Sequence, residues 1–194
     1  MSVSYYNQNA ANFVADTISV DMTDVYQRFL PLLPAGGHII DAGCGSGRDA
    51  KFFHEQGFHV TAFDASEQLV KAAHTYTGLP VICTDFLGIS SIDPVDGIWA
   101  CASLLHVPAS ELTLTLAHLA KQLQPAGVFY CSFKLGSTDT ERGGRTFTNM
   151  DQTRFSQHLP GTGLAIHTVW CSQDARPERQ AELWFNVILQ KAPE

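Results

Sequence analysis

A glycine-rich turn follows the first strongly apolar run of the sequence. The run His38-Ile39-Ile40-Asp41-Ala42 leads into Gly43-Cys44-Gly45-Ser46-Gly47, and a segment of helical period begins at Arg48. Glycines let the chain turn sharply and let a ligand touch the main chain where a Cβ would collide with it. Open α/β sheets bind ligands at the carboxyl ends of their strands, where such a turn would lie. The turn therefore predicts a site for a nucleotide-like cofactor.

Two cofactor classes are compatible with this turn. A dinucleotide site carries Gly-x-Gly-x-x-Gly. Here the third position holds Arg48 when counted from Gly43 and Ala50 when counted from Gly45. Alanine is sometimes accepted there, so an NAD site stays open. The carboxylate of Asp41 would repel a pyrophosphate but attract the ammonium and sulfonium groups of S-adenosylmethionine (SAM), and this charge favours SAM.

From residue 38 onward, apolar runs of strand length alternate with segments of helical period, which is typical of βα units and a parallel sheet. The predicted strands cover residues 38–42, 58–63, 81–84, 97–101 and 128–133. The predicted helices cover residues 48–56, the segment between Ser66 and Gly78, and residues 108–123. Ser66 is a suitable N-cap and Gly78 a suitable residue to end a helix.

The two ends of the chain differ from this alternation. Two β-rich runs, 164–171 and 183–190, are joined by a polar segment too short for a crossover helix, so they predict an antiparallel hairpin at the sheet edge. Two helices, 4–15 and 21–33, precede the sheet and could cover a site. The segment 134–149 is polar and glycine-rich, and a short amphipathic stretch follows at 151–159.

Length and composition limit the function classes. A chain of 194 residues with 45% hydrophobic residues predicts one globular domain, residues 1–194. A net charge of −7 disfavours nucleic acid as a partner. No signal peptide and no apolar run of about 18 residues is present, so we expect no membrane and a cytoplasmic location. The five cysteines form no Cys-x-x-Cys pair. They predict buried free thiols and no metal site.

The segment from Ile39 to Arg48 resembles the first motif of class I SAM-dependent methyltransferases, and is most similar to small-molecule enzymes of the tellurite-resistance and trans-aconitate type. Asp64 and Asp85 follow the next two strands at the family's spacing, and Leu123-Gln124-Pro125-Ala126-Gly127 resembles its Leu-x-Pro-Gly-Gly turn, with Ala126 in place of a glycine. The resemblance covers residues 36–133. It implies a Rossmann-like seven-stranded, mostly parallel sheet of order 3-2-1-4-5-7-6. It also implies an N-terminal helical lid (1–35), a SAM-binding core (36–133) and a substrate-side region (134–194).

The same resemblance implies roles for residues at the strand ends. Asp64 would bind the two ribose hydroxyls of SAM, Asp85 the adenine amino group, and Phe86 would pack on the adenine ring. The predicted cofactor-binding set comprises Tyr6, Asp41, Gly43, Cys44, Gly45, Arg48, Asp64, Ala65, Asp85, Phe86, Cys101 and Ala102. A cation at the start of a helix is unfavourable to its dipole, so Arg48 is expected to meet a carboxylate, either that of Asp49 or that of the cofactor.

The acceptor side carries three open predictions. His106 follows the fourth strand and is either a general base or a packing residue under the cofactor's methionine arm. Tyr5 and Tyr6 either contact the sulfonium from the lid or dock a helix. A local basic group suggests an anionic substrate, although a solvated loop would carry the same charges. This group is Lys134, Arg142, Arg145 and Arg154.

The functional prediction is in-line methyl transfer from SAM to a small molecule, leaving S-adenosylhomocysteine (SAH), by a monomer or homodimer. Methyl transfer needs mainly alignment of the reacting atoms and exclusion of water. Two alternatives remain. A non-catalytic SAM-binding regulator would lack a substrate cavity under the N-terminal helices. An NAD-dependent oxidoreductase would use the same sheet but bind NAD.

Overall fold

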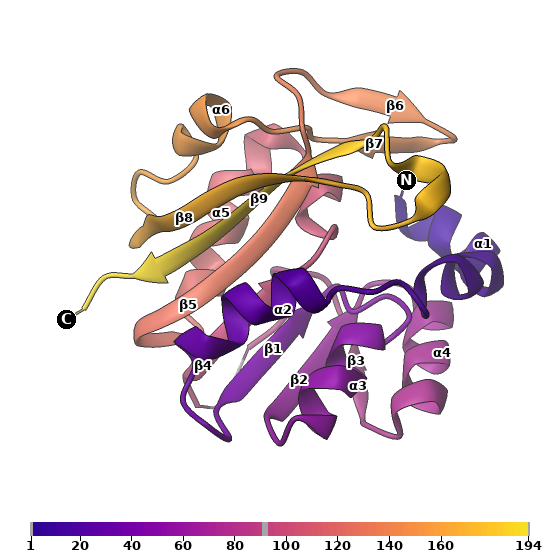
Figure 1. The fold of residues 1–194 in the computed structure, drawn as a ribbon, viewed down its shortest axis with the longest axis horizontal. Helices are drawn as coiled ribbons and strands as arrows, with labels where there is room; N and C mark the ends of the chain where they lie inside the picture. Colours follow the sequence, from indigo (N-terminus) through magenta and orange to yellow (C-terminus); the bar gives the residue numbers. More distant parts are fainter. Residues whose placement is uncertain (1, 91–92, 194) are drawn as a thin grey trace.

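The computed structural model describes residues 2–90 and 93–193, which form a large mixed sheet flanked by helices and a small separate hairpin (Figure 1). The sheet has seven strands in the order β3-β2-β1-β4-β5-β9-β8. Their bounds are β1 His38–Ala42, β2 His59–Asp64, β3 Val81–Cys83, β4 Val95–Ala100, β5 Leu123–Lys134, β8 Leu164–Gln173 and β9 Leu183–Lys191. Strand β9 is antiparallel to both of its neighbours, and the pairings among β1 to β5 are parallel. The predicted order is confirmed once the small hairpin β6–β7 is left out of the numbering.

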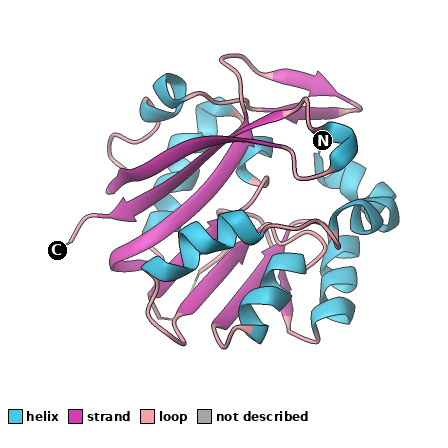
Figure 2. Cartoon of the chain, in the orientation of Figure 1, coloured by secondary structure: helices cyan, strands magenta, loops and turns pink. Residues whose placement is uncertain are grey.

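Helices cover both faces of the sheet (Figure 2). On one face lie α2 (Thr23–Phe29), α3 (Arg48–Glu55) and α4 (Glu67–Thr77), and on the other α5 (Ala109–Ala120) and α6 (Gln152–Ser156). Successive strand residues point to opposite faces, so Ile39 joins the aromatic cluster under α2 while Ile40 joins the cluster under α5. The α5 stripe of Leu112, Leu116 and Leu119 is fully buried, as its helical spacing predicts.

Helix α1 (Ser2–Thr17) lies beside α4 rather than on the sheet (Figure 1). The Oδ1 atom of Asn7 accepts a hydrogen bond of 2.7 Å from the Ser66 hydroxyl. That hydroxyl also caps α4, because its oxygen accepts from the N–H of Leu69 at 3.3 Å. Gly78, with φ 72°, ends α4 in the left-handed conformation. The predicted caps are therefore confirmed, and one of them also holds α1 in place.

Two predicted boundaries are wrong in detail, and one segment contains an element that was not expected. Strand β5 begins at Leu123 instead of residue 128, because the segment with Pro125 continues the strand across a register shift opposite Val95–Gly97. Helix α5 accordingly ends at Ala120 instead of Leu123. The polar segment 134–149 contains a hairpin, β6 (Thr140–Arg142) and β7 (Arg145–Phe147), that was not expected.

The cysteine prediction is also partly wrong. Cys44 and Cys131 are buried, but Cys83 and Cys171 are exposed, because they lie on the outer strands of the sheet, where alternate residues point to solvent. Among the described residues no group of three or more His, Cys, Asp or Glu side chains could hold a metal ion. No helix in the described part of the chain is long and apolar enough to span a membrane.

Candidate active site

A cavity of about 1360 Å³ opens at the carboxyl ends of β1, β2, β4 and β5. Helix α1 and the β6–β7 hairpin supply further walls, so segments far apart in the sequence enclose one space. Ligand sites of drug-sized molecules are commonly about 300–1,000 Å³. The cavity is therefore large enough for a cofactor together with a small second ligand.

The glycine-rich turn after β1 forms part of this cavity. Gly43, Gly45 and Gly47 all have positive φ, at 75°, 55° and 80°. A Cβ built on Gly43 would lie 2.6 Å from Cβ of Ser103, and one on Gly45 would lie 2.9 Å from Cε1 of Phe13 in α1. Glycine is thus required at both positions by conformation and by space. The contact with Phe13 also shows that α1 lies directly over the turn.

Asp64, at the end of β2, is tied to the glycine-rich turn. Its Oδ2 atom accepts from the N–H of Gly45 at 3.0 Å and its Oδ1 atom from the N–H of Ser66 at 2.9 Å. The side chain is buried, and burial raises the pKa of Asp64 above its usual value, although these hydrogen bonds oppose the shift. Ala65 lies beside it on the cavity wall. The carboxylate is therefore held in one orientation at the cavity floor.

Asp85 and Phe86 lie on the cavity wall after β3. Asp85 is exposed, and its Oδ1 atom accepts from the N–H groups of Leu87 and Gly88 at 3.0 and 2.8 Å. The Phe86 ring meets that of Phe63 edge to face, with 5.8 Å between the centroids. The turn thus fixes Asp85, and the cavity places it on the same side of the sheet as Asp64.

Asp41 is the one predicted cofactor residue that does not line the cavity. It is 2% exposed, and its Oδ2 atom has no hydrogen-bond partner among the described residues. Burial, together with the nearby charge of Asp49, raises the pKa of Asp41 well above its usual value. The neutral carboxyl is therefore favoured. A direct contact between an Asp41 carboxylate and a sulfonium is not supported, because the side chain lies beneath the turn.

Arg48 lines the cavity, but its guanidinium is already paired with the carboxylate of Asp49. Its Nε and Nη2 atoms donate to Oδ1 and Oδ2 of Asp49 at 2.7 and 2.9 Å. The same carboxylate accepts from the Tyr26 hydroxyl at 2.5 Å and from Nε1 of Trp99 at 2.8 Å. Arg48 also donates to the carbonyl oxygen of Thr17 at the end of α1, at 3.3 Å. This buried network joins α1, α2, α3 and β4 beneath the site.

The segment after β4 brings Cys101, Ala102 and His106 to the cavity. Ala102 has a positive φ of 50°, which is strained for an alanine, and its N–H donates to the Ser132 hydroxyl at 2.8 Å. The Ser103 hydroxyl donates to the carbonyl oxygen of Ala42 at 2.7 Å. The segment is therefore hydrogen-bonded to both β5 and the end of β1.

His106 and Tyr6 form a contact between the sheet and the lid. Nδ1 of His106 lies 3.2 Å from the carbonyl oxygen of Thr146, which can only accept, so Nδ1 carries the proton. Nε2 then accepts from the Tyr6 hydroxyl at 2.8 Å. Burial lowers the pKa of His106 to about 4. The imidazole is neutral near pH 7 and holds α1 over the cavity.

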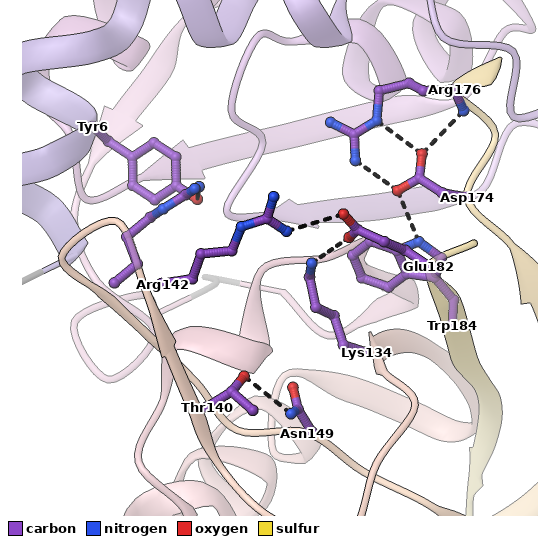
Figure 3. A network of polar contacts seen from close by, with 10 residues as sticks. Tyr6, Lys134, Thr140, Arg142, Asn149, Asp174, Arg176, Glu182 and Trp184 are labelled. Atoms are coloured by element: carbon purple, nitrogen blue, oxygen red, sulfur yellow. Dashed lines mark hydrogen bonds and ion pairs between the residues drawn. The ribbon is translucent and has the colours of Figure 1, made fainter. Parts of the chain in front are cut away.

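The predicted basic group divides into paired and unpaired charges. Lys134 and Arg142 both form ion pairs with Glu182, and Figure 3 shows the two cations converging on this carboxylate. Arg154 pairs with Asp139 at 2.7 Å and does not line the cavity. Arg145 lines the cavity and is in none of the ion pairs found among the described residues. The solvated-loop interpretation fits only Arg142, whose side chain is 69% exposed, whereas Lys134 and Arg154 are partly buried in ion pairs and Arg145 is partly buried without one.

The sequence did not point to several residues that shape this site. Phe13 covers Gly45, and Thr146 sets the tautomer of His106. Asp49, by contrast, is one of the two carboxylates that the sequence predicts as a partner of Arg48. The pairings of Tyr6 with His106 and of Arg48 with Thr17 join distant segments, so no local pattern reports them. The hairpin that presents Arg145 did leave a signal, because Gly143-Gly144 between two short β-rich segments is a typical two-residue hairpin turn.

The sheet order and the glycine-rich turn after β1 define a Rossmann-like protein of the class I methyltransferase type. The chain belongs to the Methyltransferase domain family, which it matches over residues 14–188. It is similar to the ubiquinone biosynthesis O-methyltransferase of Xylella fastidiosa (strain 9a5c), at 31% identity over 118 residues, 56% of this chain and 46% of that protein. The chain thus matches less than half the length of this curated relative.

Two solved structures share the fold over almost the whole chain. One is the 1,6-didemethyltoxoflavin-N1-methyltransferase of Burkholderia thailandensis, with TM-score 0.80 and 18% identity over 98% of this chain and 87% of that one. The other is the [4+2]-cyclase SpnF, with TM-score 0.77 and 17% identity over 100% of this chain and 96% of that one. At these identities the likeness concerns the fold, and the two names show that one fold serves different reactions.

Proposed function

We propose that this chain binds SAM between the glycine-rich turn and α1 and transfers its methyl group to a small-molecule acceptor. The observation that carries the proposal is a single cavity of about 1360 Å³ that contains the turn, Asp64 and the segment after β4. Such a volume accommodates a cofactor and an acceptor side by side. The volume also argues against a non-catalytic regulator, because a protein that only binds SAM needs no space for a second ligand.

The residues at the turn fit the cofactor. Gly43 and Gly45 line the cavity at positions where a Cβ would collide with Ser103 or Phe13. Asp64 presents oxygens that can accept from hydroxyl groups. Asp85 adds a second acid on the same side. A cationic ligand is electrostatically suited to this acidic end, whereas a pyrophosphate is not. Membership of the methyltransferase family favours the same choice over NAD.

The chain's own contribution is alignment and exclusion of water. When bound, SAM supplies an electrophilic methyl group on a sulfonium. Phe13 over Gly45, Asn7 on Ser66 and Tyr6 on His106 hold α1 over the cavity at three separate points. A histidine with a pKa of about 4 is a weak base near pH 7, and its Nε2 already accepts from Tyr6. His106 therefore holds the lid and shapes the acceptor space, and it does not act as a general base for the nucleophile of the acceptor.

The remaining predictions about the whole protein are part of the proposal. We expect a cytoplasmic location and a monomer or homodimer. We also expect no nucleic-acid partner, because the net charge of −7 would repel phosphate groups. We expect a small acceptor, since the lid and the β6–β7 hairpin both lie against the cavity.

Isothermal titration of the purified chain with SAM, SAH and NAD tests the proposal. SAM and SAH should bind, and NAD should not. In Asp64→Asn one carboxylate oxygen becomes a donor, so we expect about 10- to 100-fold weaker binding of both adenosyl ligands. Gly45→Ala should also weaken binding, because its Cβ meets Phe13.

Gly78→Ala is the matched control for Gly45→Ala. Gly78 has a similar positive φ of 72°, but a Cβ there has nothing within 4 Å and the residue lies outside the cavity. It should bind SAH as the unmodified chain does. Binding of NAD in place of SAH, or equal SAH affinity in Gly45→Ala, Asp64→Asn and Gly78→Ala, would contradict the proposed site.

A further inference from the structure

Two arginines face each other across the β6–β7 hairpin, but their surroundings differ. Arg142 and Arg145 are directly paired in the antiparallel register. The Arg142 side chain is 69% exposed and forms an ion pair of 3.2 Å with Glu182. Arg145 instead lies among aromatic rings, with its guanidinium 4.2 Å from the ring centroid of Tyr5 and 5.2 Å from that of Phe147. The hairpin thus carries one cation paired with a carboxylate, Arg142, and one cation stacked on aromatic rings, Arg145.

Arg145 has unused donors and no counterion in the described part of the chain. Its Nη1 atom donates to the Tyr6 hydroxyl at 3.4 Å, which is its one hydrogen bond among the described residues. Its Nε atom is buried without a partner. Arg145 as a whole is partly buried, and a buried donor left unpaired is costly. An anionic ligand would supply the partner that the described residues do not.

The cations near Arg145 differ from it because carboxylates lie close to them. Glu182 serves Lys134 and Arg142 and also lies in the electrostatic surroundings of Arg179. Asp174 forms a 2.6 Å ion pair with Arg176 and accepts from Trp184, as Figure 3 shows. The carboxylates of Glu182 and Asp174 thus pair with Lys134, Arg142 and Arg176. Arg179 also lines the cavity, but only Arg145 in the described part of the chain combines an unpaired guanidinium with a fixed position among aromatic rings. A ligand anion would therefore find a preoriented fork of N–H donors at Arg145.

We propose that Arg145 binds the anionic group of the acceptor, and that the acceptor is a small organic anion with a carboxylate or phosphate-type group on a flat apolar body. The inference rests on the proposed methyl transfer, because it names the second ligand of the same cavity. A guanidinium presents parallel donors that match such groups, and the rings of Tyr5 and Phe147 hold it in place. Tyr6 and His106 provide further aromatic wall for the flat body.

The arrangement of charge in the cavity supports this choice. Asp64 ends β2 and Asp85 follows β3, on one side of the turn, whereas Arg145 lies on β7, which comes after β5 in the chain. The chain of contacts from Arg145 to Tyr6 and on to His106 leads to the segment after β4. An anionic acceptor and a cationic cofactor would thus be drawn to different ends of one space, with the middle left for their reacting atoms.

Titration calorimetry with benzoate, phenyl phosphate and neutral benzamide, each with and without saturating SAH, tests the inference. We expect at least one of the two anions to bind the unmodified chain, and benzamide to bind at least about tenfold more weakly. Arg145→Gln should weaken anion binding about tenfold or more, and Arg145→Lys should fall between, because a lysine keeps the charge but not the fork. SAH affinity should not change in Arg145→Gln.

Arg142→Gln is the matched control, since it removes a cation from the directly opposite position of the same hairpin. It should change anion affinity by no more than about twofold, because the Arg142 side chain is 69% exposed and already pairs with Glu182. Equal losses in Arg142→Gln and Arg145→Gln, equal binding of benzamide, or no binding by either anion would overturn the inference. Anion binding that depends on Arg145 in a chain that fails to bind SAH would support the subsite while refuting the proposed methyl transfer.

Discussion

Asp49→Asn is expected to destabilise the fold strongly, although the side chain keeps its size. Asp49 accepts four hydrogen bonds, two from Arg48, one from Tyr26 and one from Trp99. Each of its two oxygens receives one bond from Arg48 and one from an aromatic side chain. An asparagine offers one oxygen and one amide nitrogen. Whichever way the amide turns, two donors then face a donor.

The size of the effect follows from burial. The side chains of Arg48 and Asp49 are 17% and 8% exposed, so removal of the carboxylate leaves a largely buried guanidinium without its counterion. Breaking a buried pair in this way costs about 3–5 kcal/mol. Arg48 keeps some contact with water and its bond to Thr17, so we expect the lower end, about 3 kcal/mol, which is roughly 6–12 °C in Tm for a chain of this length.

The pH dependence gives an independent check. Burial alone would raise the pKa of Asp49, but the charge of Arg48 and the hydrogen bonds from Arg48, Tyr26 and Trp99 outweigh it and lower the pKa. An acid with a depressed pKa in the folded state contributes stability above its unfolded pKa, near 4, and that contribution is lost as the pH falls through its folded pKa. The difference between the unmodified chain and Asp49→Asn should therefore narrow below about pH 4.

Urea unfolding followed by far-UV circular dichroism measures this difference, since Trp99 fluorescence would respond to the substitution itself. Asp139→Asn is the control, because it breaks the ion pair with Arg154 at a carboxylate that is 41% exposed. It should cost less than about 1 kcal/mol. If the two substitutions cost the same, or if the Asp49→Asn difference stays constant as the pH falls, the reasoning from burial is refuted.

Three further predictions concern single residues. Burial raises the pKa of Asp41 well above its usual value, so the free energy of unfolding falls as the pH rises past about 4. Asp41→Asn should therefore be more stable than the unmodified chain near pH 8, and the difference in stability should be smaller near pH 4. Urea unfolding at both pH values measures this difference. The ring protons of His106 should show no NMR inflection between about pH 5.5 and 8, and an inflection near 6.5 would contradict its burial. Ala126 has φ 63°, so Ala126→Gly should gain about 0.5–1 kcal/mol in thermal unfolding, whereas Ala120→Gly in α5 should lose about as much.

The alternation of strands and helices could be predicted because the core strands are apolar runs and because capping residues mark where a helix begins or ends. Ile39 and Ile40 in β1 and the caps at Ser66 and Gly78 are examples in which local pattern and tertiary packing agree. The start of β5 could not be predicted, because Pro125 and Gly127 form a local turn signal. Pairing with β4 outweighs that signal and continues the strand through a bulge.

The candidate site was predictable where it depends on the main chain and not where it depends on contacts between distant side chains. Gly43, Gly45 and Asp64 follow directly from strand ends and turn conformation. The structure does not support the predicted contact of Asp41 because Asp41, two residues after Ile39, points to the same buried face of β1 as Ile39. That face is buried against the start of α3, so the side chain lies beneath the turn.

The acceptor side depends on the least local information of all. Tyr6, His106 and Arg145 come from α1, the segment after β4 and the β6–β7 hairpin, and their hydrogen bonds span 100 and 139 residues of sequence. A basic count in residues 134–154 cannot distinguish Arg145 from Arg142, because the difference between them is the carboxylate of Glu182, which lies on a later segment. From the proposed role of Arg145 we therefore expect that a carboxylate placed beside it, as Glu182 lies beside Arg142, would remove anion binding without changing the glycine-rich turn.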